Sequence, residues 1–380
     1  MRDSLSSESL RFVERRRARG PFVRGLHLDM PLLIGLLTLS VIGLVTLYSA
    51  SGQDLAIVEK QIFRTALAFS AMFVLAQVPP HHIERWSPWL FTLGTMLLIA
   101  VLIAGEIGKG AQRWLDLGVI RFQPSELMKI AVPLMVAWYL SERPLPPPIK
   151  PLLGAAAMTF IPTVLIAKQP DLGTSLLVFA AGLFVILFAG LSWRIVFGLI
   201  VATIPIAWLM WVYGMHDYQR NRVLTFIDPH NDPLGTGYHI IQAEIAIGSG
   251  GTYGKGWLNG TQSHLDFIPE SSTDFIFAVF AEEFGLLGSC VLMAINLFLI
   301  GRGLYIASQA QSSFTRLVAG ALTMTYFVYV FVNMGMVTGI LPVVGVPLPL
   351  ISYGGTSLVT IMSAFGILMS IHTHRRLLPT

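Results

Sequence analysis

The 380-residue chain has few charged residues and a single cysteine. Only 12% of its residues are Asp, Glu, Lys or Arg, about half the share of an ordinary soluble domain, which excludes a conventional soluble enzyme. The one cysteine, Cys290, excludes an internal disulfide framework and a cysteine-based metal site. Because the formal net charge is only +4, the composition gives no indication of nucleic-acid binding.

Apolar residues make up 54% of the chain, and many of them stand in runs close to the roughly 20 residues that cross a bilayer. These runs lack the polar alternation that is typical of barrel strands, so they predict helices. The sequence therefore predicts an all-α polytopic membrane protein with ten transmembrane helices, near residues 31–50, 62–79, 88–106, 125–140, 152–167, 173–191, 194–214, 274–299, 317–341 and 355–371.

Basic residues indicate the orientation of this membrane domain. Residues 1–29 are polar and rich in arginine, without the short apolar core and small-residue cleavage site of a signal peptide. An even number of spans puts both chain ends on one side, and the positive-inside rule makes that side the cytoplasm. We expect a cytoplasmic tail over 1–29, a membrane domain over 30–373 and a cytoplasmic end over 374–380.

One outer loop, over residues 215–273, separates the seventh and eighth predicted helices. Long structured loops usually carry function, so we expect the functional site to face outward. The loop contains GSGGTYGKG, but Ser249 and Gly256 stand where a nucleotide-binding phosphate loop needs glycine and Ser or Thr. We expect a glycine-rich turn, with Lys255 as a candidate contact to a phosphate.

Acidic residues border the eighth predicted helix. Asp266, Glu270 and Asp274 follow at four-residue intervals, and Asp274 immediately precedes the apolar run. An aspartate there is either a helix N-cap or a carboxylate at the membrane surface, where a low dielectric favours a general base. Glu282 and Glu283 lie inside the run, where such side chains must face protein or water.

The segment RFQPSELMK begins the fourth predicted helix. Glu126 and Lys129 are three residues apart and can pair on one helical face, either as a structural ion pair or to position another carboxylate. Further cations face outward in this orientation, and together they suit a polyanionic group such as pyrophosphate. The candidates are Arg113, Arg121, Arg220 and Arg222.

Two further segments connect predicted helices. KQPD, at 168–171, is most simply a tight hairpin. The segment 333–357 contains three prolines and several glycines within apolar sequence. Since proline interrupts regular helix, we expect a re-entrant or cavity-lining turn, or else a rigid hairpin.

These motifs together resemble the SEDS family of shape, elongation, division and sporulation proteins. The likeness rests on QPSE at 123–126, KQPD, PESSTDFIFAVFAEEFG at 269–285 and the 333–357 segment. GILPVVGVPLPLISYGG and YQRNRVLTFIDP resemble the RodA-like, rod-shape branch more than the division branch. Ser271 and Ser272 depart from the Arg-His pair that is common in that branch.

The resemblance implies the SEDS fold and a peptidoglycan glycosyltransferase in the cytoplasmic (inner) membrane, with its active site on the outer, periplasmic side. Such an enzyme polymerises lipid II onto a lipid-linked glycan strand for cell elongation. It works with a class B penicillin-binding protein and other elongation-machinery proteins. The family's essential carboxylate matches Asp274, and its cavity ion pair matches Glu126 and Lys129.

Residue chemistry is compatible with this activity. A base must take a proton from the acceptor hydroxyl, and cations must stabilise the departing undecaprenyl pyrophosphate. No cofactor is predicted; a divalent cation, Mg²⁺ or Mn²⁺, could share the pyrophosphate charge, but no ligand set stands out, so the metal stays open. Two alternatives also stay open: a lipid II flippase and a noncatalytic scaffold of the elongation machinery.

Overall fold

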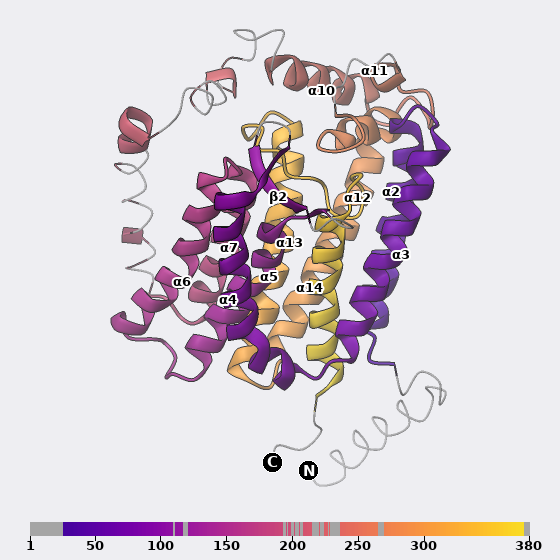
Figure 1. Cartoon of the computed structure of the whole chain (residues 1–380). Helices are drawn as coiled ribbons and strands as arrows, with labels where there is room; N and C mark the ends of the chain where they lie inside the picture. The colour runs from indigo at the N-terminus through magenta and orange to yellow at the C-terminus, as the bar shows by residue number, and fades with distance from the viewer. Residues whose placement is uncertain are drawn as a thin grey trace, which may run out of the picture.

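A computed structural model of the chain consists mainly of long helices that run side by side (Figure 1). It describes residues 26–108, 111–116, 121–192, 195, 197–198, 201, 205, 208–214, 220, 224–226, 228, 236–264 and 270–375. The α-helices are α2 (Met30–Ala50), α3 (Leu55–Gln77), α4 (Pro80–Ala104), α5 (Pro124–Ser141), α6 (Ile149–Lys168), α7 (Leu172–Phe188), α10 (Thr236–Gly250), α11 (Thr261–His264), α12 (Ile276–Ser308), α13 (Ser313–Val337) and α14 (Thr356–Thr373). A π-helix, η1, covers Met210–Gly214.

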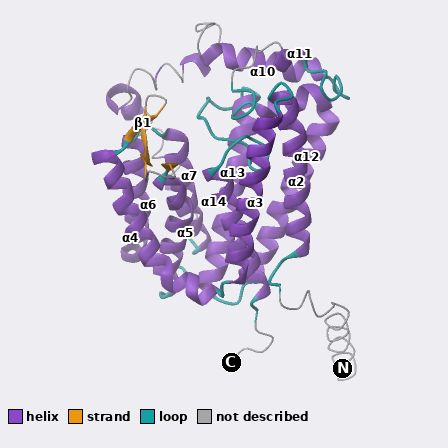
Figure 2. Cartoon of the chain, turned by 45° about the vertical axis from the view of Figure 1, so that its right-hand side comes forward, coloured by secondary structure: helices purple, strands orange, loops and turns teal. Residues whose placement is uncertain are grey.

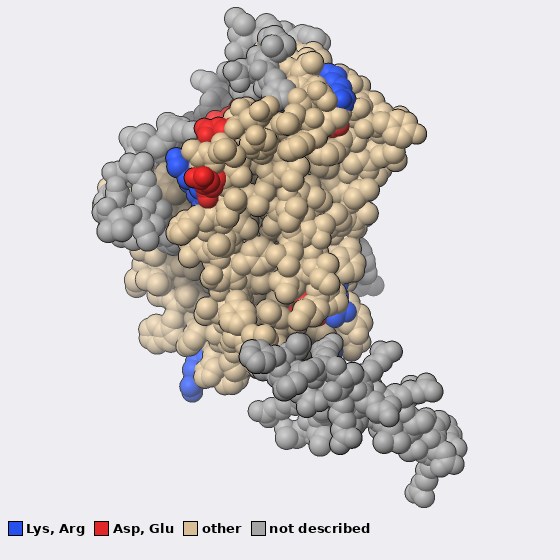
Figure 3. Space-filling model, turned by 90° about the vertical axis from the view of Figure 1, so that its right-hand side faces the viewer, with Lys and Arg blue, Asp and Glu red and all other residues tan. Residues whose placement is uncertain are grey.

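Six helices of the described residues are long and apolar enough to cross a membrane: α2, α4, α6, α12, α13 and α14. Figure 3 shows a wide band of one face without Lys, Arg, Asp or Glu, as a lipid-facing surface requires. The multi-pass membrane class is thus confirmed. Helices α3, α5 and α7 coincide with three further predicted runs, whereas most of the run near 194–214 lies outside the described residues.

A small sheet and two helices were not expected from the sequence. A small antiparallel sheet joins α4 to α5, in the order β1 (Glu106–Gly108), β2 (Ala111–Asp116) and β3 (Arg121–Phe122) (Figure 2). Its strands are too short to give a clear period-2 pattern. Helices α10 and α11 lie within the predicted 215–273 loop and extend across one end of the bundle (Figure 1).

Helix α12 is interrupted at Gly285, whose φ of 64° and ψ of −163° are not helical. The interruption frees the backbone carbonyls of Glu282 and Glu283, which accept hydrogen bonds from the amides of Lys255 (3.0 Å) and Gly256 (2.9 Å). A Cβ atom on Gly285 would stand 2.3 Å from the backbone nitrogen of Gly254. Only glycine fits here, and the outer loop supplies the partners that the helix lacks.

An ion-pair cluster joins three helices at the opposite end of the bundle from α10 and α11. Asp29 is the N-cap of α2 and accepts the Leu32 amide (3.0 Å). Its Oδ2 also lies 2.7 Å from Arg302 Nη2 of α12 and 2.6 Å from His372 Nδ1 of α14. Burial alone would raise the pKa of this carboxyl, but the hydrogen bonds from His372 and Arg302 outweigh burial and hold the pKa well below its ordinary value.

Replacing Asp29 with asparagine should therefore destabilise the bundle by about 1–3 kcal/mol at pH 7, because the buried charge-assisted bonds are lost. A depressed folded-state pKa means that the stabilisation is fully present above the ordinary Asp pKa of about 4 and is lost as the pH falls below it. Apparent melting temperatures of detergent-solubilised wild type and Asp29→Asn should differ fully near pH 7, keep most of that difference at about pH 4, and converge only as the pH falls through the depressed folded-state pKa.

Asp54→Asn provides the matched control. Asp54 also caps a long helix, α3, through a bond from the Ala56 amide (2.8 Å), but it is exposed. Asparagine caps helices about as well as aspartate, so this variant should melt close to wild type. A pH-independent difference between Asp29→Asn and wild type would contradict the assigned role of the Asp29 charge.

Candidate active site

Asp274 lies in the turn that leads into α12. The N-cap position of that helix is Phe275, so Asp274 stands one residue before the cap rather than at it. Its side chain is half-buried. The backbone around it is held by contacts with residues far away in the sequence, and these contacts define the candidate site.

Asn333 of α13 is the main anchor of the Asp274 turn. Its side chain is fully buried, and its amide nitrogen Nδ2 donates to the carbonyl of Asp274 (2.9 Å) and to the carbonyl of Val346 (2.7 Å). One carboxamide therefore binds the Asp274 turn and the proline-rich segment together. Gly345 brings that segment close to the carboxylate: at its φ of +74°, a Cβ atom would stand 3.4 Å from Asp274 Oδ2.

Backbone contacts extend this attachment. The Ser352 hydroxyl donates to the Thr273 carbonyl (2.6 Å) and accepts from the Leu348 amide (2.7 Å). The Tyr353 amide donates to the Ser272 carbonyl (2.8 Å). Residues 348 and 350–352 are all buried. The proline-rich segment is thus a packed turn between helices, as predicted, rather than an exposed loop.

The QPSE and KQPD motifs meet beside this turn. Gln123 Nε2 donates to Asp171 Oδ2 (3.0 Å), while Asp171 Oδ1 caps α7 by accepting the Thr174 amide (3.2 Å). A Cβ atom on Gly173 would stand 2.6 Å from the carbonyl oxygen of Val344. The KQPD turn is therefore more than the simple hairpin expected from the sequence, because it packs directly against the proline-rich segment.

Glu126 and Lys129 form the predicted ion pair, with 2.7 Å between Oε1 and Nζ. Both side chains are buried, at 8% and 4% exposure, so the pair lies inside the bundle and not at its surface. The Lys129 ammonium also lies 5.1 Å from the centre of the Tyr329 ring. Tyr329 precedes Asn333 by one helical turn, so the residue that contacts the Lys129 ammonium and the residue that anchors Asp274 follow each other along α13, about 6 Å apart along its axis.

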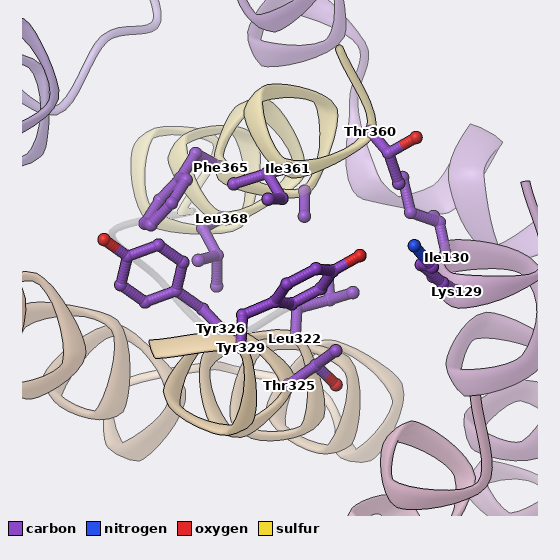
Figure 4. Close-up of a pocket in the computed structure, with 11 residues that line it drawn as sticks. Lys129, Ile130, Leu322, Thr325, Tyr326, Tyr329, Thr360, Ile361, Phe365 and Leu368 are labelled. Atoms are coloured by element: carbon purple, nitrogen blue, oxygen red, sulfur yellow. The ribbon is translucent and has the colours of Figure 1, made fainter. Parts of the chain in front are cut away.

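A small cavity adjoins this ion pair, between α5, α13 and α14 (Figure 4). Its walls include Lys129, Tyr329 and Thr360, but most of its lining is apolar. Its volume of about 30 Å³ exceeds the roughly 10–15 Å³ that one water molecule needs. The cavity is too small to hold a sugar.

The loop residues Lys255, Glu282 and Glu283 are tied to one another. Glu282 Oε1 accepts from Lys255 Nζ (2.7 Å) and from the Thr261 amide (2.9 Å). Glu283 Oε1 accepts from the Leu258 amide (3.2 Å) and from the Ser49 hydroxyl. Both glutamates are buried and hold the outer loop on α12. The charge of Lys255, expected to contact a phosphate, has a carboxylate partner.

The remaining predicted residues are more scattered. Arg220 donates to the carbonyls of Trp211 and Val212 (both 3.1 Å), and exposed Glu270 accepts from the Thr273 hydroxyl (2.7 Å). Arg113 and Arg121 lie on β2 and β3, whereas Asp266 and Arg222 lie outside the described residues. Within the described ranges, no group of three or more His, Cys, Asp or Glu could hold a metal ion.

Sequence reasoning missed the polar residues that hold the site together, above all Asn333, Ser352 and Tyr329. Asn333 had one usable signal, since an amide inside an apolar run must find a partner in a membrane. The identity of that partner is a tertiary contact, which no local pattern contains.

The geometry defines a class: a multi-helix membrane protein in which a half-buried carboxylate stands near a buried ion pair, beside a packed proline-rich turn. The family model for FtsW, RodA and SpoVE, described as cell cycle protein, matches residues 28–377. The chain belongs to this family, and the resemblance to its RodA-like branch is confirmed.

Individual relatives agree with this assignment. The peptidoglycan glycosyltransferase MrdB of Escherichia coli K12 is 55% identical over 352 residues, which cover 93% of this chain and 95% of MrdB. A solved peptidoglycan synthase complex that coordinates polymerization and crosslinking contains a chain with a TM-score of 0.81 and 30% identity, covering 91% of this chain and 97% of that chain. The crystal structure of Thermus thermophilus RodA has a TM-score of 0.69 at 26% identity, over 92% of this chain and 98% of that one.

Asn333→Ala should loosen the site locally. The substitution leaves the buried carbonyls of Asp274 and Val346 without their shared donor, at a cost of about 1–3 kcal/mol for each. Hydrogen exchange should accelerate in the amides of 343–353 and 271–275. Asn296→Ala is the control, because Asn296 is also buried but bonds Tyr326 (2.6 Å) away from the turn. Equal acceleration in both variants would contradict the anchoring role of Asn333.

Glu126 and Lys129 should behave as one unit. Glu126→Gln leaves a buried ammonium without its carboxylate and should cost about 3–5 kcal/mol, whereas adding Lys129→Met removes that charge and should recover much of the loss. Apparent melting temperatures of wild type, both single variants and the double variant measure the coupling. Strict additivity would argue against a coupled pair.

Proposed function

We propose that this protein is a peptidoglycan glycosyltransferase that polymerises lipid II into glycan strands for cell elongation. The 55% identity to Escherichia coli MrdB across almost the whole length of both chains supports this activity. The site supports it through the half-buried Asp274 carboxylate and the buried Glu126–Lys129 pair of α5. Two residues of α13 contact them, Asn333 at Asp274 and Tyr329 at Lys129.

Asp274 acts as the general base in this proposal. It accepts the proton of the acceptor sugar hydroxyl while that oxygen bonds to the anomeric carbon of the donor. The bond from the anomeric carbon to the lipid pyrophosphate breaks in the same step, which inverts the anomeric centre. The half-exposed Asp274 side chain is accessible to a substrate hydroxyl, as a general base must be.

The anchoring contacts explain how the base keeps its direction. Asn333 and Ser352 bind the backbone on both sides of the carboxylate, so the side chain can rotate only about its own bonds. General-base catalysis requires an oxygen within about 3 Å of the proton donor, which makes a fixed backbone valuable. The Glu126–Lys129 pair of α5 supports α13 through the ring of Tyr329. It does so without adding net charge, since its two charges largely compensate each other.

Topology and partners complete the proposal. In the proposed ten-span topology both chain ends are cytoplasmic. The Asp29 cluster then lies on the cytoplasmic side, and Asp274 lies on the outer side with α10 and α11. The likeness to a chain of a peptidoglycan synthase complex supports a class B penicillin-binding protein as partner. Mg²⁺ or Mn²⁺ would share the charge of the substrate pyrophosphate, with oxygen ligands from the phosphates themselves.

Asp274→Asn should abolish polymerisation while leaving folding and partner binding intact. Loss of a general base lowers the rate by about 100-fold or more, and asparagine keeps the shape of the side chain. The measurement is glycan-chain formation from labelled lipid II by the purified complex in detergent.

Glu59→Gln is the matched control, because Glu59 is an exposed acid on α3 and should not affect the rate. Chains made by wild type in detergent, where no membrane separates two sides, exclude a protein that only flips lipid II or only organises a complex. Full activity of Asp274→Asn would refute the assignment of the base.

A further inference from the structure

Arg64 is a cation inside the predicted membrane zone that the proposed mechanism does not use. It lies on α3, about 14 Å along the helix axis from Leu55. The neighbouring side chains Phe63 and Leu67 are 72% and 54% exposed, as on a lipid-facing helix. No described carboxylate forms an ion pair with Arg64, although a charge at this depth is costly without an anionic partner.

Arg64 instead faces the start of α14. Its guanidinium carbon lies 4.5 Å from the centre of the Tyr353 ring, which holds the planar group by a cation–π contact. A Cβ atom on Gly355, the N-cap residue of α14, would stand 3.5 Å from Arg64 Nε. Gly355 has no side chain to cap the helix, so the N-cap residue supplies no acceptor for the first-turn amides.

Further polar groups lie beside the same turn. The hydroxyl of Tyr329 interacts with Lys129 and with Ser357, and the Oε2 atom of Glu126 is buried without a hydrogen-bond partner among the described residues. Tyr329, only 2% exposed, lies against Ser357 in the first turn of α14 and points toward Lys129 (Figure 4). The first turn of α14 therefore has polar groups of α13 beside it as well as the guanidinium of Arg64.

The depth of the turn restricts what can reach it. Figure 1 shows that the upper end of α14 lies below the upper ends of α12 and α13, with the proline-rich segment descending to it. Arg64, Tyr353 and Gly355 are nevertheless half-exposed. A ligand that arrives at this depth must have an anionic head and an apolar tail, which describes a lipid phosphate and not a soluble anion.

We propose that Arg64 and the first turn of α14 bind the pyrophosphate of a polyprenyl lipid, with Tyr353 orienting the guanidinium. A guanidinium presents a planar fork that matches phosphate oxygens, and a helix N-terminus adds backbone donors and a favourable dipole. The inference rests on the proposed function, because it identifies where that reaction holds the phosphates of its lipid-linked substrate.

The test measures binding and turnover separately. Full-length wild type and Arg64→Gln are reconstituted in phosphatidylcholine nanodiscs, and binding of undecaprenyl pyrophosphate is measured directly. Loss of the Arg64 guanidinium should weaken binding of undecaprenyl pyrophosphate by about tenfold or more, and a tenfold change corresponds to about 1.4 kcal/mol. The KM for lipid II should rise with a smaller change in kcat. Tyr353→Leu keeps the charge of Arg64 but removes the ring that holds its guanidinium, so this variant should show a smaller loss of affinity.

Lys60→Gln is the matched control. Lys60 is an exposed cation one turn away on the same helix, so its removal changes the charge equally but should leave affinity unchanged. Equal weakening by Lys60→Gln, or wild-type affinity in Arg64→Gln, would overturn the inference. Should Arg64→Gln melt earlier than wild type, Arg64→Lys replaces it, since lysine keeps the charge without the fork and should still bind more weakly.

Competing lipids separate the possible sources of the phosphate. Undecaprenyl monophosphate should compete less well than the pyrophosphate, and phosphatidylglycerol should compete least. Equal competition by phosphatidylglycerol would overturn the assignment, because the site would then hold any anionic lipid. A wild-type protein that binds undecaprenyl pyrophosphate but makes no glycan would instead refute the proposed function.

Discussion

A single buried carboxamide determines the arrangement of the site. Asn333 donates to two carbonyls from segments that are far apart in the chain, those of Asp274 and Val346. In an apolar interior neither carbonyl has bulk water as an alternative donor, so both segments must meet at the same point of α13. The direction of the Asp274 carboxylate, the packing of Gly345 beside it and the position of the proline-rich turn all follow from this contact.

The same need for backbone partners explains the irregular parts of the bundle. Where α12 opens at Gly285, amides of the outer loop replace the missing helical donors. Where proline prevents helix after α13, Ser352 and Ser272 take part in bonds that close the turn. Irregular backbone in membranes is tolerated where it is enclosed by protein, and here the proline-rich segment borders the candidate site.

Much of the helical architecture follows from the sequence because length and hydropathy are local properties. The Glu126–Lys129 pair was predictable for the same reason, since a spacing of three residues on one helix makes them neighbours. The three short strands contain too little pattern to be recognised. Lys255 with Glu282, and Arg64 with Tyr353, are tertiary contacts between distant segments, so the sequence presents each cation only as an unpaired outward charge.

The break in α12 joins the outer loop, with its helices α10 and α11, to the membrane helix by backbone hydrogen bonds. The loop segment from Gly251 to Gly256 completes the hydrogen bonding of α12 around Gly285. A displacement of the outer loop with α10 and α11 is therefore transmitted directly to α12. Asp274 stands in the turn that leads into the same helix, eleven residues before Gly285. A protein that docked on α10 and α11 could therefore shift the segment that carries Asp274 through the first part of α12, without touching the cavity.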